Sequence, residues 1–296
     1  MSPTSAIADL RPRRSVLYIP ASKDRAVDKA RGLGADVIIL DLEDAVAPAA
    51  KDDARDKAAE AVKAGGFGDA ELVIRINALD TPWGSADLAA AAAAGPDAIL
   101  LPKISRAEDL ATASGRLVEH DPAGAVALWS MMETAEGILN AQSIAAASPR
   151  LKAFVMGTND LAKELRTRPT PDREPLLTSL SLVILAARSR GLAAIDGVFG
   201  DLDDADGLDR ECRQGLALGF DGKTLIHPKQ IDPTNAIFAP ADDEVDSARR
   251  IIQGWSEQGG DEKGVITVDG RMVEALHVEQ ARYLVAMKDA IDARQG

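Results

Sequence analysis

The sequence has few of the residues that build disulfide scaffolds and zinc sites. It contains one cysteine, Cys212, and three histidines among its 296 residues. One cysteine cannot form an intrachain disulfide, which fits a reducing compartment, and the chain offers no cluster of Cys and His of the kind that holds zinc. Cys212 lies among charged residues with no histidine nearby in the sequence. We therefore expect a packed thiol rather than a nucleophile.

Several signature segments are also absent. The sequence has no P-loop, no GxGxxG and no GxSxG motif, which argues against the common phosphate-cradling loops and a serine nucleophile elbow. The longest run of small residues, 88–94, is far shorter than the roughly 20 residues that cross a bilayer. Residues 1–14 are polar and do not resemble a signal peptide. We therefore expect a soluble, cytoplasmic protein without a membrane partner.

Positive charge is scarce. Lys and Arg number 34 against 47 Asp and Glu, which gives a formal net charge of −13. Such a chain repels nucleic acid and anionic lipid surfaces, so we exclude nucleic acid as a partner. A small anionic substrate is still compatible if a metal ion or a local basic patch holds it.

Short apolar runs recur along the chain, each followed by a stretch of helical character. This alternation predicts βαβ units around a parallel sheet, and eight units favour a closed (β/α)8 TIM barrel over an open sheet. We assign this α/β barrel to residues 1–231. The expected strands are 15–19, 37–41, 72–76, 98–101, 125–129, 153–156, 193–198 and 222–226. The clearest expected helices are 22–33, with Ser22 as N-cap, 50–64, 106–120, 174–190 and 203–218.

Residues 232–296 are too many for a bare tail on a closed barrel. Residues 232–243 hold two prolines and several acids, which indicates a linker. Two helices are expected at 244–257 and 273–293, with an extended pair at 264–271 between them, turning at Asp269-Gly270. We expect this C-terminal helical extension to contact a neighbouring subunit.

Two carboxylates follow neighbouring strands of the expected barrel. Active sites of such barrels lie at the C-terminal ends of the strands, and Glu133 and Asp160 follow the fifth and sixth strands. Mg²⁺ prefers hard oxygen ligands and uses one or two carboxylates while keeping several waters. Each acid could instead only cap the next helix. A pair with Arg75 and Lys103 on the same rim favours a metal site.

Arg75 lies inside an apolar strand, where a guanidinium needs an anion. One interpretation is a structural ion pair with Asp41, Glu43 or Asp44. The other is a planar fork that binds a substrate carboxylate, and both can hold together. Three acids in four positions cannot all be dry and ionised. We expect hydrogen bonds to Arg75, to Lys103 or to metal-bound waters to relieve them.

Basic residues gather near the start of the chain. On so acidic a protein they could grip the phosphates of a nucleotide-like handle, although a solvated helix face is the plain alternative. The cluster comprises Arg13, Arg14, Lys23, Arg25 and Lys29. His227, which precedes Pro228, is expected to serve packing or hydrogen bonding.

Together these segments resemble the citrate lyase β-subunit-like and malyl-CoA lyase group of CoA-ester lyases, in the HpcH/HpaI aldolase superfamily. The similar segments span nearly the whole chain in order, which makes the combination specific. They are RSVLYIPAS (14–22), DVIILDLEDAV (36–46), VIRIN (73–77), ILLPK (99–103), MMETAEGILN (131–140), MGTNDLAKEL (156–165), GKTLIHPKQI (222–231) and DGRMVEALHVEQA (269–281).

The resemblance implies a barrel with C-terminal helices, assembled as a homotrimer or homohexamer. It implies Mg²⁺, or Mn²⁺ in its place, on Glu133 and Asp160, and Arg75 on the carboxylate of a keto acid. A C-terminal acid of the family, often an Asp, reaches into a neighbouring subunit's site. The matching position here is Glu274, one methylene longer, which we expect to transfer a proton.

The implied activity is reversible carbon–carbon cleavage of a 3-hydroxyacyl-CoA, such as malyl-, methylmalyl- or citramalyl-CoA. The products would be an acyl-CoA and glyoxylate or pyruvate. A malyl-CoA thioesterase, an aldolase of free acids and a β subunit that needs an acyl-carrier partner stay open. We predict Arg75, Asp41 and Glu274 as catalytic residues. The predicted substrate-binding residues are Arg75, Glu43, Asp44, Lys103, Arg14, Lys23, Arg25 and Lys29.

Overall fold

The structure, a computed structural model, describes residues 10–294. The chain divides into two compact units. One is Arg13–Phe238, and the other joins residues 239–294 with residues 10–12. The predicted division at residue 231 was therefore placed seven residues too early.

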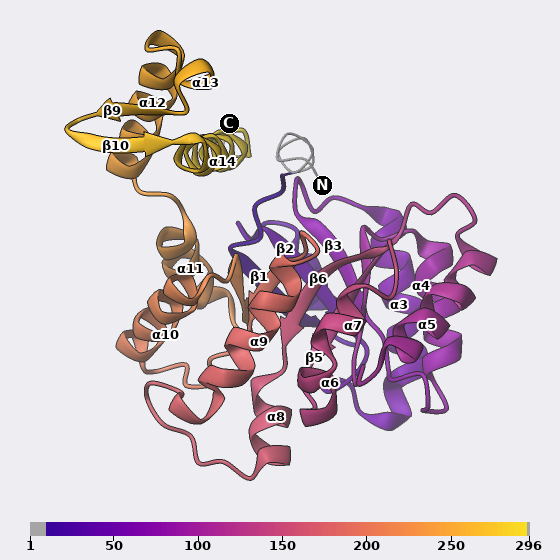
Figure 1. The fold of residues 1–296 in the computed structure, drawn as a ribbon. Helices are drawn as coiled ribbons and strands as arrows, with labels where there is room; N and C mark the ends of the chain where they lie inside the picture. The colour runs from indigo at the N-terminus through magenta and orange to yellow at the C-terminus, as the bar shows by residue number, and fades with distance from the viewer. Residues whose placement is uncertain (1–9, 295–296) are drawn as a thin grey trace. The chain divides into compact units, whose positions relative to one another are not determined.

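Eight parallel strands close the first unit into a barrel, as the alternating pattern predicted. Each strand pairs with the next one along the chain, and β8 pairs with β1 to complete the ring. Helices surround the strands (Figure 1). The strands are β1 Ser15–Pro20, β2 Val37–Asp41, β3 Glu71–Arg75, β4 Ala98–Leu101, β5 Ala127–Met132, β6 Leu151–Met156, β7 Ala193–Asp196 and β8 Gly222–Leu225.

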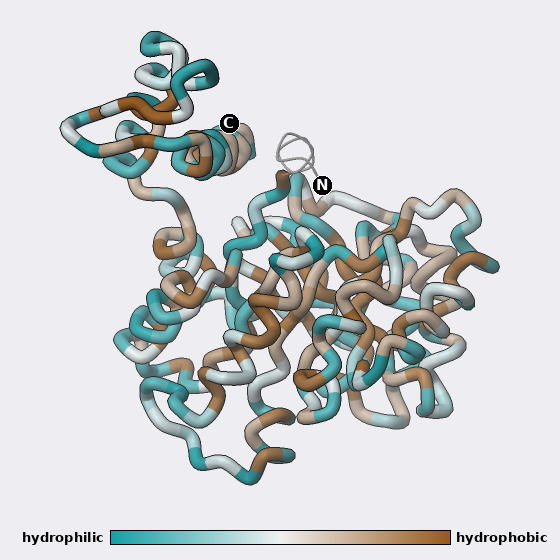
Figure 2. The backbone as a smooth tube through the Cα atoms, viewed as in Figure 1, coloured by the Kyte–Doolittle hydropathy of each residue, from teal (hydrophilic) through white to brown (hydrophobic). Residues whose placement is uncertain are grey.

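Two hydrophobic layers explain why the strands are apolar on both faces. Alternate residues such as Val16 and Ile39 fill the barrel interior, while Leu17 and Ile38 pack against the helices. Figure 2 shows hydrophobic segments gathered within the ring of helices. The helices of this unit are α2 Asp24–Ala30, α3 Lys51–Ala64, α4 Gly84–Ala94, α5 Ala107–His120, α6 Ala135–Leu139, α7 Ala141–Ala145, α8 Thr158–Leu165, α9 Leu177–Arg188, α10 Ala205–Leu218 and α11 Ile231–Phe238, with short 3-10 turns η1 Pro48–Ala50, η2 Glu174–Leu176 and η3 Pro228–Gln230.

The predicted linker at 232–243 is wrong, because most of it is helical. Pro233 is the third residue of α11, where its missing N–H would have no intrahelical partner in any case. Asp242 and Asp243 lie in the first turn of the next helix, where the helix dipole favours negative charge. Prolines and acids that suggest a linker are thus used here to begin two helices. The expected N-cap Ser22 is also displaced, since α2 begins after Lys23.

The C-terminal unit contains the predicted hairpin between helices. Its elements are α12 Asp242–Glu257, α13 Gly260–Lys263, β9 Val265–Val268, β10 Arg271–Glu274 and α14 Ala275–Asp292. Asp269 and Gly270 both have positive φ, 50° and 74°, as a two-residue type I′ turn requires. A small core of Trp255, Ile266, Val273 and Val278 holds the hairpin against its helices.

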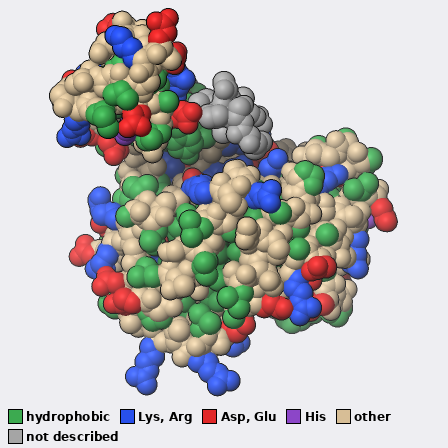
Figure 3. Space-filling model, in the orientation of Figure 1, with side chains coloured by type: hydrophobic (Ala, Val, Ile, Leu, Met, Phe, Trp, Pro, Cys, Tyr) green, Lys and Arg blue, Asp and Glu red, His purple; other side chains and the backbone are tan. Residues whose placement is uncertain are grey.

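The surface carries no large region of one charge on the face shown in Figure 3, where acidic and basic side chains are interspersed. None of the helices within residues 10–294 combines the length and the apolar character needed to cross a bilayer.

A buried ion cluster lies between β7, β8 and the helices outside them. Asp196 at the end of β7 contacts Arg173 at 2.8 Å and Lys223 of β8 at 3.1 Å, and Lys223 also contacts Glu211 of α10 at 2.5 Å. Asp196 and Lys223 are fully buried. Burial alone would raise the pKa of Asp196, but Lys223 and Arg173 hold it below its ordinary value. Each charge in this cluster therefore depends on its partners.

We expect Lys223→Ala to lower the free energy of unfolding by about 3–5 kcal/mol, because it leaves Asp196 buried without one of its two cations. Urea unfolding followed by circular dichroism measures this. Arg213→Ala is the matched control, because it breaks an exposed pair with Asp209 on the same helix as Glu211 and should change stability little. Equal stability of both variants would contradict a structural role for the buried cluster.

Candidate active site

A cavity of about 290 Å³ opens at the C-terminal end of the barrel. Residues at the ends of β1, β2, β3, β5, β6 and β8 line it. Most of the polar residues that were predicted at the C-terminal ends of the strands therefore lie on one rim of the barrel. Its wall includes Tyr18, Asp41, Asp44, Arg75, Met131, Glu133, Asp160 and Thr224. A larger cavity of about 370 Å³ borders the loops after β3 and β4, but Arg75, Glu133 and Asp160 are not in its wall. The smaller cavity is therefore the candidate active site.

Glu133 and Asp160 converge on one cation. Glu133 follows β5 and is buried, and Asp160 lies in the first turn of α8. The Lys103 Nζ lies 2.8 Å from Asp160 Oδ2 and 3.4 Å from Glu133 Oε1. An ammonium thus marks a point that both carboxylates can reach.

This donor set fits magnesium, the metal that the sequence implies. Within residues 10–294 no group of three or more His, Cys, Asp or Glu side chains is placed to hold a metal ion. Two carboxylates are enough for Mg²⁺, which fills its other positions with water and substrate oxygens. Glu133 and Asp160 are the residues that would hold it.

The backbone around Glu133 fixes its carboxylate. The Lys103 N–H donates a 2.7 Å hydrogen bond to Glu133 Oε1, and Lys103 adopts a left-handed conformation with φ of 56°, which is uncommon for a residue other than glycine. Gly157 lies against the same side chain. A Cβ added at residue 157 would come within 2.6 Å of Glu133 Oε2, so only glycine leaves room for the carboxylate.

Electrostatics show that the pair needs a positive partner. Burial raises the pKa of Glu133, Lys103 opposes this, and the nearby Asp160 adds to the rise. Burial lowers the pKa of Lys103, but the hydrogen bond to Asp160 and the charge of Glu133 raise it above its ordinary value overall. The ammonium therefore compensates the two acids.

Arg75 forms a bidentate ion pair with Asp41. Nε and Nη2 lie 2.6 and 2.7 Å from the two carboxylate oxygens, and the two residues are register partners at the ends of β3 and β2. Nη1 lies 3.0 Å from Glu43 and 3.3 Å from Asp44. The contacts with Asp41 confirm the structural ion pair that the sequence allowed. The third nitrogen, Nη1, contacts Glu43 and Asp44.

Asp41, one of the predicted catalytic residues, contacts Arg75 and the backbone of the loop after β2. Its carboxylate is fully buried, and beyond Arg75 it accepts hydrogen bonds from the backbone N–H groups of Glu43 and Ala45. Both oxygens are already committed, so Asp41 is a positioning residue that orients Arg75.

The pKa of the Glu43 carboxyl is strongly raised. Burial raises its pKa to about 8, and Asp44, Glu133 and Asp41 add to the rise against the opposing charge of Arg75. Burial is the largest cause, and Glu43 also shares one guanidinium with two other carboxylates, so it keeps a proton near neutral pH.

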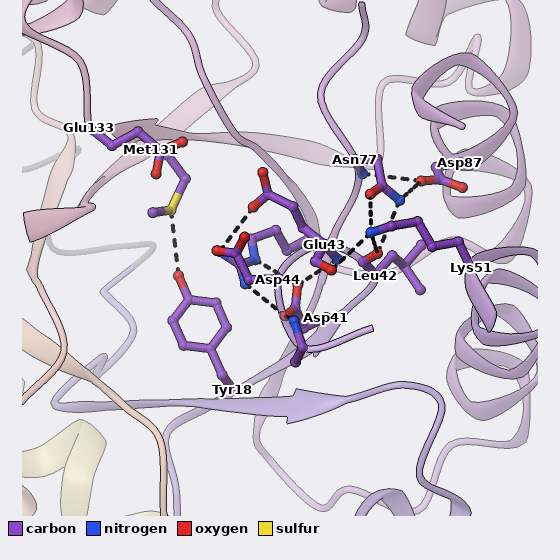
Figure 4. Close-up of polar contacts among 12 residues, drawn as sticks. Tyr18, Asp41, Leu42, Glu43, Asp44, Lys51, Asn77, Asp87, Met131 and Glu133 are labelled. Carbon is purple, nitrogen blue, oxygen red and sulfur yellow. Dashed lines mark hydrogen bonds and ion pairs between the residues drawn. The ribbon is translucent and has the colours of Figure 1, made fainter. Parts of the chain in front are cut away.

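A second polar network beneath the loop after β2 was not predicted. The Lys51 Nζ donates to the Leu42 and Glu43 carbonyls at 2.9 Å and to Asn77 Oδ1 at 2.5 Å. Asn77 in turn donates to Asp87 at 2.6 Å. Figure 4 shows this chain of contacts beside the acids after β2. Lys51 begins an expected surface helix, and nothing in its sequence context indicates burial.

The basic residues near the start of the chain lie at two separate positions, before β1 and after it. Arg14 precedes β1, so it lies at the opposite end of that strand from the cavity, where it forms a buried bidentate pair with Asp36 at 2.8 and 2.9 Å. The prediction that Arg14 binds substrate is therefore wrong. Arg13 likewise pairs with Glu71, at 2.6 Å. Lys23, Arg25 and Lys29 lie exposed at the start of α2 and along it, on the segment that leaves the C-terminal end of β1, and their role stays a prediction.

Three further residues named in the sequence analysis are Glu274, Cys212 and His227, and the structure gives the position of each. Glu274 ends β10 in the C-terminal unit and immediately precedes α14, so its proposed reach into a barrel site stays a prediction. Cys212 is buried beside Thr234, as expected for a packed thiol. His227 accepts a hydrogen bond from the Lys229 N–H at the start of η3, consistent with a structural function.

Fold and site together define a (β/α)8 barrel with a pocket at its C-terminal rim that is lined by acids and one arginine. The HpcH/HpaI aldolase/citrate lyase family matches residues 14–228, and the chain belongs to this family, an enzyme family of the citrate lyase β type.

Two relatives and one solved structure illustrate the similarity. The chain is 51% identical over 282 residues to a (3S)-malyl-CoA thioesterase of Cereibacter sphaeroides, covering 95% of this chain and 96% of the relative. It is 34% identical over 290 residues to citrate lyase subunit beta of Escherichia coli, covering 96% of each. The structure is protein CitE from Mycobacterium tuberculosis in complex with magnesium, acetoacetate and coenzyme A, with a TM-score of 0.76, 29% identity, and coverage of 95% of this chain and 99% of that one.

We expect Lys103→Ala to bind Mg²⁺ roughly tenfold more tightly than the wild type, because it removes a like charge that competes for Glu133 and Asp160. Glu133→Gln and Asp160→Asn should each weaken binding by tenfold or more. Isothermal titration calorimetry without substrate measures these affinities. Lys152→Ala, at an exposed lysine near the other end of β6, is the control and should bind as the wild type does. Unchanged affinity in Lys103→Ala would contradict the shared site.

The Glu43 pKa predicts a pH dependence of stability. Between about pH 4.5 and pH 8 the folded state keeps a proton that the unfolded state releases, so stability falls as pH rises through this window. Glu43→Gln cannot titrate. The stability of this variant relative to the wild type should therefore increase by about 2–4 kcal/mol across the window. Urea unfolding in the presence of a chelator at several pH values measures this, and a constant difference would show that Glu43 ionises normally.

Proposed function

We propose that the protein is a magnesium-dependent enzyme that acts on a 3-hydroxyacyl-CoA such as malyl-CoA, and that hydrolysis of the thioester is its main reaction. The observation that carries this choice is 51% identity over nearly the whole chain to a malyl-CoA thioesterase, in a protein whose cavity joins a carboxylate pair to a buried arginine. Carbon–carbon cleavage, the reaction that the resemblance implied, is the second candidate. It is favoured by the 34% identity to a citrate lyase β subunit.

The substrate has two charged ends, and the barrel offers a partner for each. The carboxylate of the acid end fits Nη1 of Arg75, which contacts Glu43 and Asp44 in the structure, while Asp41 holds Nε and Nη2 in place. The phosphates of the CoA end fit Lys23, Arg25 and Lys29, which are exposed on the segment after β1. Glu43, Asp44 and Lys103 border the acid end and would contact it directly or through water.

Bound by Glu133 and Asp160, Mg²⁺ or Mn²⁺ would supply a Lewis acid to the hydroxyl and carboxylate oxygens of the substrate. The residues of the chain do the rest. Arg75 stabilises negative charge on the acid end, and the buried pair with Asp41 keeps it from turning away. Glu43 holds a proton near neutral pH, so it can donate a hydrogen bond where an ionised acid would repel the substrate.

The two candidate reactions differ in the bond that breaks. In hydrolysis, water adds to the thioester carbon, the carbon–sulfur bond breaks, and malate and CoA form. In cleavage, the hydroxyl loses its proton, the bond between C2 and C3 breaks, and glyoxylate forms with the enolate of acetyl-CoA, which is then protonated at carbon. Glu274 is our candidate for that proton transfer.

We further propose a homotrimer or homohexamer in which Glu274 completes the site of a neighbouring subunit. The C-terminal unit is compact in itself, with its own core and hairpin, and Glu274 lies where its last strand meets α14. A citrate-lyase-type complex with an acyl-carrier partner is a third candidate, supported by the same β-subunit relative.

Malyl-CoA incubated with the purified protein and Mg²⁺ separates these functions. We expect free CoA thiol and malate without glyoxylate, because hydrolysis releases the thiol and keeps the carbon chain intact. Glyoxylate with acetyl-CoA would identify the lyase instead. Neither product, with activity appearing only when an acyl-carrier protein is added, would favour the complex subunit.

Variants test the residues in the same assay. Glu133→Ala and Asp160→Ala should reduce kcat by at least 10³-fold, because they remove the proposed metal ligands. Glu274→Gln should spare Mg²⁺ affinity and impair only a reaction that uses its proton transfer. Wild-type rates in both metal-ligand variants would overturn the assignment.

A further inference from the structure

Tyr18 places a phenol across the mouth of the barrel. Within β1, Val16 and Tyr18 face the interior whereas Leu17 and Ile19 face the helices. The Tyr18 hydroxyl donates to the Met131 Sδ at 3.4 Å. Because β1 pairs only with β2 and β8, this contact with β5 crosses the barrel interior. Figure 4 shows the hydroxyl pointing toward Met131 and Glu133.

The Tyr18 hydroxyl donates to a weak acceptor, the Met131 sulfur, although charged side chains line the same cavity. A thioether sulfur is a poor acceptor, and a buried tyrosine normally finds an oxygen or nitrogen partner. Tyr18 lines the candidate active site together with Arg75, Asp44 and Glu133, and the Arg75 guanidinium lies 4.6 Å from the centre of its ring. The Tyr18 O–H therefore faces the cavity and can donate to a stronger acceptor in place of the Met131 sulfur.

The phenol stays protonated in this environment. Burial raises its pKa above the ordinary value, and Asp41, Glu133 and Glu43 add to the rise against the opposing charge of Arg75. Tyr18 can therefore donate a hydrogen bond over the whole physiological range, and it is not a general base.

We infer that the Tyr18 hydroxyl donates a hydrogen bond to the thioester carbonyl oxygen of the substrate. Tyr18 lies between the two ends that the substrate would occupy. The chain runs from β1 directly into Lys23 and α2, where the CoA phosphates are proposed to bind, whereas Arg75, Glu133 and Asp160 hold the acid end. The thioester carbonyl joins those ends. This inference rests on the proposed CoA thioester substrate and adds a specific donor to it.

The same oxygen becomes negative in both candidate reactions. In hydrolysis the carbonyl π electrons move to it when water adds, and they return when the carbon–sulfur bond breaks and the thiolate leaves. In cleavage it carries the charge of the acetyl-CoA enolate until carbon is protonated. A neutral donor aimed at that oxygen stabilises either transition state. Tyr18 keeps its proton throughout.

Tyr18→Phe tests this role, because it removes the hydroxyl and leaves the ring over Arg75. We expect kcat for malyl-CoA to fall roughly 10²-fold, as for loss of one oxyanion donor, with a rise in KM of no more than about tenfold and no change in Mg²⁺ affinity. If the hydroxyl serves only to pack against Met131, kcat stays at the wild-type value.

A binding experiment gives a second readout that does not require turnover. Calorimetry with Mg²⁺ compares acetyl-CoA, which has the thioester oxygen, with free CoA, which lacks it. Tyr18→Phe should weaken acetyl-CoA binding about threefold to tenfold and leave CoA binding unchanged. Equal weakening of both ligands, or of neither, overturns the inference.

The two readouts separate this inference from the proposed function. A wild type that turns over malyl-CoA, with an equally active Tyr18→Phe variant, sinks the role of Tyr18 and leaves the function standing. A wild type that neither hydrolyses nor cleaves malyl-CoA sinks the function. The ratio of acetyl-CoA to CoA affinity then still decides whether Tyr18 contacts a thioester.

Discussion

The ion pair of Arg75 with Asp41 is the constraint on which the site depends. It joins the last residues of two neighbouring strands in register, and it is buried. Breaking such a pair leaves an uncompensated charge in a low-dielectric interior, which is strongly unfavourable. The pair therefore orients the guanidinium at the rim before any substrate arrives. The loop after β2 is held from below by Lys51 through its contacts to two backbone carbonyls, so the acids beside Arg75 have little freedom either.

Much of this architecture could be predicted because each feature has a local physical cause. Strands covered on both faces must be apolar throughout, and helices must return the chain between parallel strands, so eight repeats predict a closed ring. Polar residues at strand exits then fall on one rim by topology alone. This is why Glu133, Asp160, Arg75 and Lys103 could be placed together from their spacing. In the structure, the Lys103 Nζ lies 3.4 Å from Glu133 and 2.8 Å from Asp160, and Arg75 lines the same cavity as both acids.

Other features depend on contacts that sequence order does not reveal. Arg14 and Lys23 are close along the chain, but one precedes β1 and the other follows it, so a whole strand separates them. Pro233 suggested a linker because the first turn of a helix and a loop tolerate proline equally well. Tyr18 looked like one more apolar strand residue. The donor role that we infer for it depends on the thioether across the barrel and the guanidinium over its ring, and neither partner is near it in the sequence.

The ammonium of Lys103 between Glu133 and Asp160 affects how the pocket behaves when no metal ion is bound. Two carboxylates facing each other without a cation would push the loops after β5 and β6 apart. A tethered charge from the neighbouring loop keeps them together, so the pocket would keep its shape without a metal ion. Reloading then requires one side chain to swing aside and no refolding of the backbone. On the proposed function, the protein would therefore regain its metal site without refolding when divalent ions return.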